Sequence, residues 1–530
     1  MKKIVLYITF LFAVSVGVRG NETSTKNNSS PTGIYSVREY GVKGDGITID
    51  TKAIQAVIDK AAAEGGGVIL FPPGQYVSGS IVLKDYIVLR FESGAILYGS
   101  LDIRDYPADL GVLYIGGDYV WKGPLIYAEN VRYIGIEGPG IIDGRGSYEN
   151  FPPFPRSNQR PGLIRFKDCK FVTVKEVTMR DAGCWTFHLR NCEDVMVRDI
   201  HIDSNVNRNN DGIDVDGGRR ISIIGCNINS EDDAIVLKSF LREKITDIII
   251  ADCIISSTCS AIKIGTESVG HFENISISNC VIYGSRGINL FSVDGSIINN
   301  VTISNISLRD CKSVFQLRLG ARLRPYQIPK DLQPTHAGQI KNIMVSNIQA
   351  TGVLESQCFI SGIPGYHIEN VDLSNIRIEY YGYGTQSQAE REIPEEITRY
   401  PKIGMFGDLP SYGFFVRHVS GIRLNNIRLT VVNPDLRPAF VFDSVSDISI
   451  SDCILEGSRS ESPLIRLHQV NDIIIRNSSP KGSINTFVGV SGKESKGIII
   501  KDNMLERARK TVEISEEVKE NAVRDINNIR

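Results

Sequence analysis

The chain has 530 residues, more than one compact core usually supports, yet no linker or block of charge divides it into separate domains. It carries 59 Lys and Arg against 61 Asp and Glu, and its basic residues are scattered. This balance argues against nucleic acid or an anionic membrane as a partner, and the length favours an elongated solenoid.

The first residues have the pattern of a secretory signal peptide. Lys2 and Lys3 precede an apolar run from 4 to 18, and small residues follow it. We predict a signal peptide at 1–20 and a disordered leader at 21–33, which places the mature protein in the periplasm or outside the cell. The alternative is a short membrane anchor, although the run is short for a span and no cysteine follows it to accept a lipid.

The ten cysteines would suggest disulfides in an exported chain. Most of them instead recur at one place in a repeated pattern, before an apolar pair, as small hydrophobic residues would in the interior of a stacked coil. We therefore predict buried free thiols at Cys169, Cys192, Cys226, Cys253, Cys280, Cys311 and Cys453.

A cap is predicted at the start of the mature chain, in residues 34–100. A short strand near Tyr35 is followed by an amphipathic helix from about Thr51 to Glu64, with Asp50 as its N-cap and Gly65 as its end. Such a helix can cover the open end of a β-solenoid. Its apolar face comprises Ile54, Val57, Ile58, Ala61 and Ala62.

The long middle of the chain, residues 101–503, repeats short β-branched segments that end in Asn, Asp or Cys. The spacing is regular from Cys226 to Cys253 to Cys280, and it stretches at two insertions, 318–339 and 380–413. The pattern predicts an all-β fold, a single right-handed parallel β-helix with insertions on one face. In the tail, 504–530, the apolar residues Val518, Ala522, Ile526 and Ile529 predict a short C-terminal helix.

Two acidic clusters stand one coil apart, Asn209–Asp214 and Ser230–Ile235. Asp211 and Asp232 are 21 residues apart, so neighbouring rungs about 4.8 Å apart would bring Asp211 beside Asp232 and Asp233. Carboxylates this close resist joint ionisation, which creates the proton donor and acceptor that glycosidic hydrolysis needs. The alternatives are solvated turns and a calcium site.

These clusters resemble the first two motifs of the polygalacturonase family of inverting glycosidases, glycoside hydrolase family 28. The segment 65–76 also resembles the amino-terminal signature of pectin-degrading parallel β-helix proteins. The resemblance implies that Asp232 is the general acid, that Asp211 and Asp233 activate the water, and that Asn209 holds the arrangement. It implies no metal or other cofactor, and a cell-wall polysaccharide or oligosaccharide substrate; we expect a monomer.

The later family motifs are altered. Cys259 stands where a histidine is usual, and Asn289-Leu290-Phe291 replaces the Arg-Ile-Lys that engages a uronate. The resemblance then implies another substrate, such as rhamnogalacturonan or a decorated galacturonan, or a carboxylate contact supplied from elsewhere.

Candidate substrate-binding residues are the cations Lys238, Lys263, Arg286, Arg318 and Arg322, each with a surface charge as its alternative. The insertion 380–413 and the residues after it add aromatic candidates. Phe406 or Tyr412 would stack on sugar rings in a wall that favours chain-end cleavage. His418, Trp185 and His188 are further cleft candidates.

Three functional classes follow from these observations. The first is a hydrolase of pectic polysaccharide. The second is a calcium-dependent polysaccharide lyase on the same fold, and the third is a non-catalytic glycan-binding β-helix.

Overall fold

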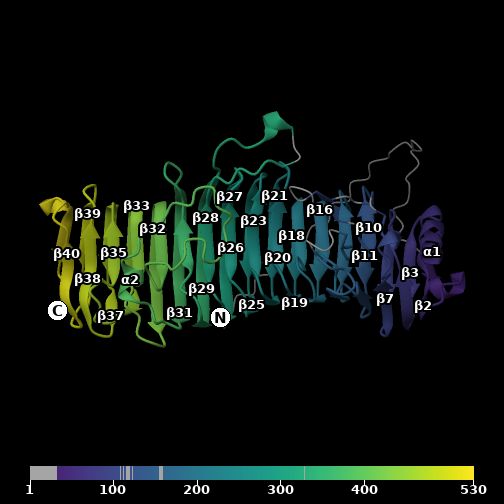
Figure 1. Ribbon diagram of the computed structural model, residues 1–530, viewed down its shortest axis with the longest axis horizontal. Coiled ribbons are helices and arrows are strands. Elements are labelled where there is room, and N and C mark those ends of the chain that lie inside the picture. Colours follow the sequence, from purple (N-terminus) through teal and green to yellow (C-terminus); the bar gives the residue numbers. More distant parts are fainter. Residues whose placement is uncertain are drawn as a thin grey trace, which may run out of the picture.

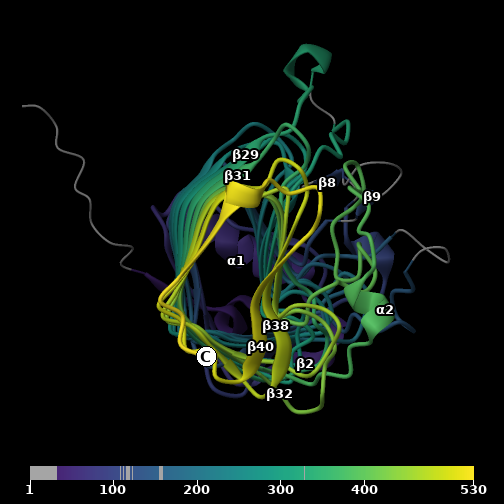
Figure 2. The same cartoon turned by 90° about the vertical axis from the view of Figure 1, so that its left-hand side faces the viewer.

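The protein is one long parallel β-helix (Figure 1). The computed structural model describes residues 33–530 except 108, 111–112, 115–119, 122, 154–158 and 327–328. The predicted signal peptide and nearly all of the predicted leader lie outside the described residues. Seen along the long axis, successive turns superpose around a shared interior, and α2 (Gln386–Ala389) stands outside the coil (Figure 2).

A helical cap closes one end, as predicted. Helix α1 (Thr51–Ala63) buries Ile54, Val57, Ile58 and Ala61 beside β3 (Gly67–Phe71), which pairs with β1 (Ile34–Ser36). Asp50 precedes the helix, but its carboxylate accepts hydrogen bonds from the backbone nitrogens of Lys43 and Gly44 and does not cap it. Asp50 therefore fixes the preceding turn.

The rungs of the coil stack in register. Strand β18 (Ile213–Ile224) lies between β16 (Phe187–Arg198) on one side and β20 (Ile235–Ser239) and β21 (Ile245–Ala251) on the other. Every second side chain points inward, so β-branched residues form columns of matched apolar surface. One column, with each side chain at most 2% exposed, contains Ile221, Ile248, Ile275, Val301, Ile343, Val371, Ile422, Ile448 and Ile473.

Asparagines stabilise one corner of the coil. Each of five successive rungs places an asparagine with φ between 52° and 57° at this corner, and from the second rung on each side-chain nitrogen donates to the side-chain oxygen of the preceding asparagine at 2.9–3.1 Å. Asparagine tolerates the left-handed region better than most residues, so this corner repeats at low cost. The ladder comprises Asn279, Asn305, Asn347, Asn375 and Asn426.

The cysteines are free, and the seven in the repeat are buried, as predicted. Several stack on neighbouring rungs, where hydrogen bonding between the Cys226 and Cys253 thiols lowers the pKa of the first and raises that of the second. They act as interior residues of the coil.

The predicted C-terminal helix is wrong. Residues 504–530 add further strands: β40 (Ala508–Ile514) pairs with β38 (Ile484–Ser491), and β41 (Val523–Ile526) pairs with β39 (Lys496–Lys501). Val518 and Ala522 are buried, the latter in a single 3-10 turn, Glu520–Ala522. The open edge of the preceding rung offers backbone hydrogen bonds, which outweigh a weak helical spacing.

In the described part of the chain, no helix is long and apolar enough to cross a membrane.

Candidate active site

The two acidic clusters meet at the carboxyl-rich start of two adjacent strands. The backbone nitrogen of Gly212 donates to the carbonyl oxygen of Asp233 at 3.0 Å, and Ile213 is the register partner of Ile235. Asp211 therefore lies opposite Asp233, with Asp232 one residue before it. One coil here is 22 residues, so the register puts the three carboxylates on neighbouring rungs as the sequence predicts.

Lys238 on β20 is committed to two carboxylates. Its Nζ lies 2.8 Å from Asp211 Oδ2 and 2.8 Å from Asp214 Oδ1, and 3.9 Å from the ring centre of Trp185. Burial nevertheless raises the pKa of Asp211 well above its usual value, and it raises the pKa of Asp214 to about 7. Lys238 thus orients Asp211, whereas the sequence placed it among the candidate substrate-binding residues.

Lys263 on β23 (Ile262–Ser268) serves Asp233 in the same way. Its Nζ lies 2.8 Å from Asp233 Oδ2, and the backbone nitrogen of Ser260 donates to Oδ1 at 3.2 Å. Burial raises the pKa of Asp233, but Lys263 and Lys238 outweigh it, so the net pKa is lowered. Asp233 is therefore ionised at neutral pH.

Asp232 is the most accessible of the three carboxylates. Its Oδ1 accepts from the backbone nitrogen of Asp233 at 3.0 Å, and Asn209 Nδ2 donates to its Oδ2 at 3.5 Å. Asn209 has φ 58° and accepts from Arg160 Nη2 at 2.8 Å. Nothing in the sequence marks Arg160 as part of the site, because only the folded chain brings residue 160 to this turn.

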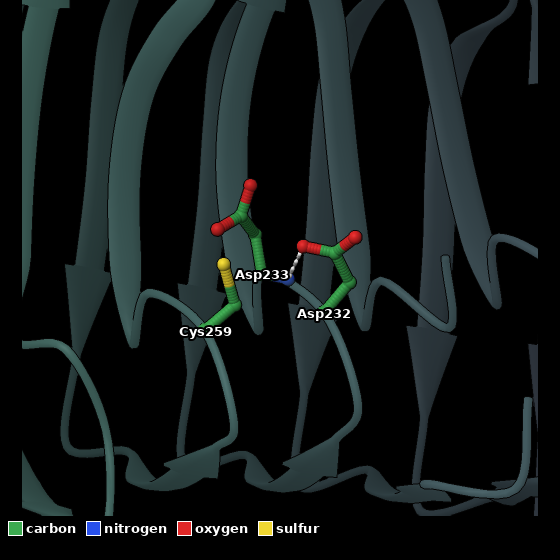
Figure 3. Close-up of side chains that lie close together, drawn as sticks. All are labelled: Asp232, Asp233 and Cys259. Atoms are coloured by element: carbon green, nitrogen blue, oxygen red, sulfur yellow. Dashed lines mark hydrogen bonds between the residues drawn. The ribbon is translucent and has the colours of Figure 1, made fainter. Parts of the chain in front are cut away.

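Asp232, Asp233 and Cys259 form the group of possible metal ligands within the described residues (Figure 3). One ligand atom from each lies within 4.8 Å of the others. Burial, followed by the charge of Asp233, raises the pKa of the Cys259 thiol, and Lys263 already occupies Asp233. Calcium prefers six to eight oxygen ligands, so this donor set suits it poorly.

A pocket of about 250 Å³ opens beside Asp232. Lys263, Arg286, Asn289 and Phe291 line it, whereas Leu290 points into the core of the coil. Gln316, Tyr400 and Lys402 also line the pocket. These three could not be singled out from the sequence, because one insertion and a distant rung have to fold before they meet.

Several predicted cleft residues lie elsewhere. Arg318 is 1% exposed and donates to the carbonyl oxygens of Gly362, Glu395 and Glu396, so it anchors the 380–413 insertion and does not reach a substrate. Tyr412 is also 1% exposed and lies in the main core, where its hydroxyl donates to the backbone of Glu456.

Phe406 and His418 are also committed to the fold. Phe406 is buried in an aromatic cluster with Phe359 and Phe415, so the predicted sugar stacking does not hold for Tyr412 or Phe406. His418 is nearly buried, with Nε2 3.0 Å from Glu395 Oε1, and it does not line the pocket beside Asp232.

The remaining candidates pack around the carboxylates. Trp185 lies against Lys238, and the buried His188 accepts from Arg165 Nε at 3.1 Å. Burial, together with Arg165, lowers the pKa of His188 well below its usual value, so the ring is neutral. Arg322 forms an ion pair with Asp294.

The parallel β-helix and its three neighbouring carboxylates define the class of the site, which is that of a glycosidase. Residues 117–397 match the model of glycosyl hydrolases family 28, and residues 34–95 match rhamnogalacturonase A/epimerase, pectate lyase-like. The first match spans more than half of the chain. The protein therefore belongs to glycosyl hydrolases family 28 and is a polygalacturonase-like glycoside hydrolase.

Individual relatives agree with this assignment. A probable polygalacturonase from Vitis vinifera is 25% identical over 370 residues, 65% of this chain and 74% of that protein. An exo-poly-alpha-D-galacturonosidase from Dickeya chrysanthemi is 35% identical over 134 residues, 24% of this chain and 22% of that protein.

Two solved structures share the fold. An exopolygalacturonase from Thermotoga maritima is similar with a TM-score of 0.59 at 21% identity, covering 66% of this chain and 88% of that one. A family 28 exopolygalacturonase from Yersinia enterocolitica gives a TM-score of 0.61 at 18% identity, covering 79% and 78%.

Proposed function

We propose that the protein hydrolyses glycosidic bonds of a pectic polysaccharide or oligosaccharide with inversion at the anomeric carbon. The observation that carries this proposal is the unequal setting of the three carboxylates. Asp233 is kept ionised beside Lys263, while Asp232 lines the pocket and forms no ion pair with any residue in the described part of the chain. Inversion requires such a pair, one carboxylate to take a proton and one carboxyl to give one.

The roles follow from this setting. Asp232, in its protonated form, donates to the glycosidic oxygen as the bond to the anomeric carbon breaks. Asp233, with Asp211 beside it, accepts a proton from the water that attacks the opposite face. Lys238 and Lys263 hold the latter two carboxylates in place and stabilise negative charge on them.

We further propose rhamnogalacturonan or a decorated galacturonan as a better substrate than plain homogalacturonan. The two positions where the family carries cations hold Asn289 and Phe291, and both line the pocket. An amide and an aromatic face suit a neutral or deoxy sugar, and a carboxylate placed against them lacks a charged partner. A polygalacturonate chain is then hydrolysed slowly.

The 380–413 insertion supports a proposal of chain-end cleavage. Residues 400–403 form one wall of the pocket, and Arg318 and Arg417 anchor the insertion through its backbone carbonyls. A fixed wall favours a chain end over an internal segment. We also propose that the protein is exported, on the basis of the pattern in residues 1–20.

The proposal is tested by digesting a panel of pectic oligosaccharides and identifying the products by mass. Hydrolysis adds water at each cut, whereas a lyase leaves unsaturated, ultraviolet-absorbing ends. New reducing ends without unsaturation are expected. Unsaturated products would establish the lyase, and an absence of any product from the whole panel would favour a non-catalytic glycan-binding protein.

Replacing Asp232 tests its role directly. Asp232→Asn removes the acid at nearly constant volume, so we expect kcat to fall by roughly 100- to 10,000-fold with an unchanged melting temperature. The exposed Asp331→Asn serves as the matched control. Near-normal turnover by Asp232→Asn would contradict the assignment.

A further inference from the structure

The floor of the pocket beside Asp232 carries two amides whose oxygens have no partner. Asn289 on β26 (Ile288–Ser292) and Gln316 on β28 (Phe315–Leu319) are register neighbours. Their nitrogens donate to Ser260 Oγ at 2.9 Å and to the carbonyl oxygen of Gln357 at 3.0 Å. Asn289 Oδ1 and Gln316 Oε1 are buried and accept no hydrogen bond.

An unpaired buried acceptor costs free energy, so these two oxygens point to a ligand that supplies donors. The side chains are 3% and 0% exposed, and Gln316 is held by Gln357. Sugar hydroxyl groups are donors of the required kind. A carboxylate facing the two oxygens would instead be repelled.

The walls of the same pocket carry two cations. Arg286 stands in the turn before β26, and its Nε is buried without a hydrogen-bond partner. Lys402 is exposed and lines the pocket from the insertion. Within the described residues, neither side chain forms an ion pair with a carboxylate. Lys263, the third cation of the pocket, is already paired with Asp233.

The segment that carries Lys402 is fixed to the coil. The backbone nitrogen of Gly404 donates to Gln357 Oε1 at 3.3 Å, and Gln357 Nε2 donates to the carbonyl oxygen of Gly407 at 3.2 Å. Met405 and Phe406 are buried in the aromatic cluster. Gln357 thus ties the Gln316 amide and the Lys402 segment together, so the floor and this wall of the pocket are fixed in position relative to each other.

We propose that Arg286 and Lys402 bind the carboxylate of a substrate uronate from the walls, while Asn289 and Gln316 accept hydrogen bonds from sugar hydroxyls on the floor. The inference rests on the proposed function and adds to it the residues that select the substrate. In this proposal Arg286 and Lys402 take over the carboxylate contact that other family members make with cations at the positions of Asn289 and Phe291. The cations on the walls and the unpaired amide oxygens on the floor together favour a chain in which a uronate neighbours a neutral sugar.

The test measures binding by calorimetry in the inactive Asp232→Asn protein, so that hydrolysis does not consume the probe. The probes are a rhamnogalacturonan tetrasaccharide and trigalacturonate, each as the acid and with every carboxyl reduced to an alcohol. Arg286→Gln and Lys402→Met are compared with Arg459→Gln and Lys493→Met, exposed cations on other turns.

We expect the acidic rhamnogalacturonan tetrasaccharide to bind at least roughly tenfold more tightly than its reduced form, since a charge-assisted hydrogen bond is lost on reduction. Arg286→Gln and Lys402→Met together should remove this preference and leave binding of the reduced probe unchanged. The control variants should retain it. Gln316→Leu should weaken the acidic and reduced probes alike.

Equal affinity for the acidic and reduced probes would overturn the inference. So would an equal loss of affinity for both probes in the wall variants, Arg286→Gln and Lys402→Met. The wild-type enzyme is assayed in parallel on the same acidic oligosaccharides. If it hydrolyses them while the wall variants keep their preference for acid, the inference fails and the proposed function stands. If no probe is hydrolysed or bound, both fail.

Discussion

At the scale of single residues, the site assigns one lysine to each of two buried aspartates. Lys238 lies between Asp211 and Asp214, and Lys263 lies against Asp233. A buried carboxylate without such a partner takes up a proton, because burial disfavours its charged form. Lys263 and Lys238 therefore keep Asp233 ionised, whereas Lys238 opposes the burial of Asp211 only in part.

The pH dependence of catalysis should show this effect for Lys263. Lys263 and Lys238 lower the pKa of Asp233, and Lys263→Met leaves its burial less opposed, so that pKa rises. A base has to be ionised, so the acidic limb of the kcat/KM profile should move to higher pH, with the largest loss of activity below neutrality. An acidic limb that stays in place, with activity lost equally at all pH values, would contradict this role.

The trio of aspartates could be predicted from sequence because their spacing equals one coil. The lysine partners could not be assigned, since Lys238 and Lys263 reach their carboxylates only through the register of three rungs. Tyr412 was misplaced for a related reason. An aromatic-rich insertion gives no sign of which rings face the cleft and which fill the core.

Replacing Tyr412 distinguishes a ring that fills the core from a ring that faces the cleft. Tyr412→Leu should lower the free energy of unfolding by about 2–4 kcal/mol, because the buried ring and its hydrogen bond are lost. KM on pectic oligosaccharides should stay the same. A raised KM with unchanged stability, measured by denaturant unfolding, would restore the stacking role.

At the scale of elements, the corner asparagines hold adjacent rungs together. The three inner ones combine a left-handed backbone with two side-chain hydrogen bonds along the ladder. Asn347, in the middle, donates to Asn305 at 2.9 Å and accepts from Asn375 at 3.1 Å. The repeated Asn in the sequence predicted the corner, although not the ladder of amides that joins successive rungs.

Two substitutions of Asn347 distinguish its backbone from its side chain. Asn347→Gly keeps the tolerance for positive φ and loses the hydrogen bonds, whereas Asn347→Ala loses both. We expect the alanine variant to be less stable than the glycine variant by about 1 kcal/mol in denaturant unfolding. A more stable alanine variant would show that backbone strain does not matter at this corner.

At the scale of the whole molecule, the coil is closed at one end by α1 and extended at the other by β40 and β41. The amphipathic pattern of α1 is local, so the sequence predicted it within one residue. The last strands are specified by the exposed edge they pair with, which lies outside their own sequence, and a helical spacing of four apolar residues was misleading there.

The long coil serves the site by fixing the register of neighbouring rungs. Asp211 and Asp233 face each other because Ile213 pairs with Ile235, and the pocket floor is set by Asn289 beside Gln316. We infer that this register supports hydrolysis with inversion.

The anomeric configuration of the first product tests that claim most directly. Proton NMR spectra recorded during the first minutes of hydrolysis of an α-linked pectic oligosaccharide should show the β-anomer of the new reducing end before mutarotation, with no such signal from Asp232→Asn. The α-anomer as the first product, or an unsaturated end, would contradict the account.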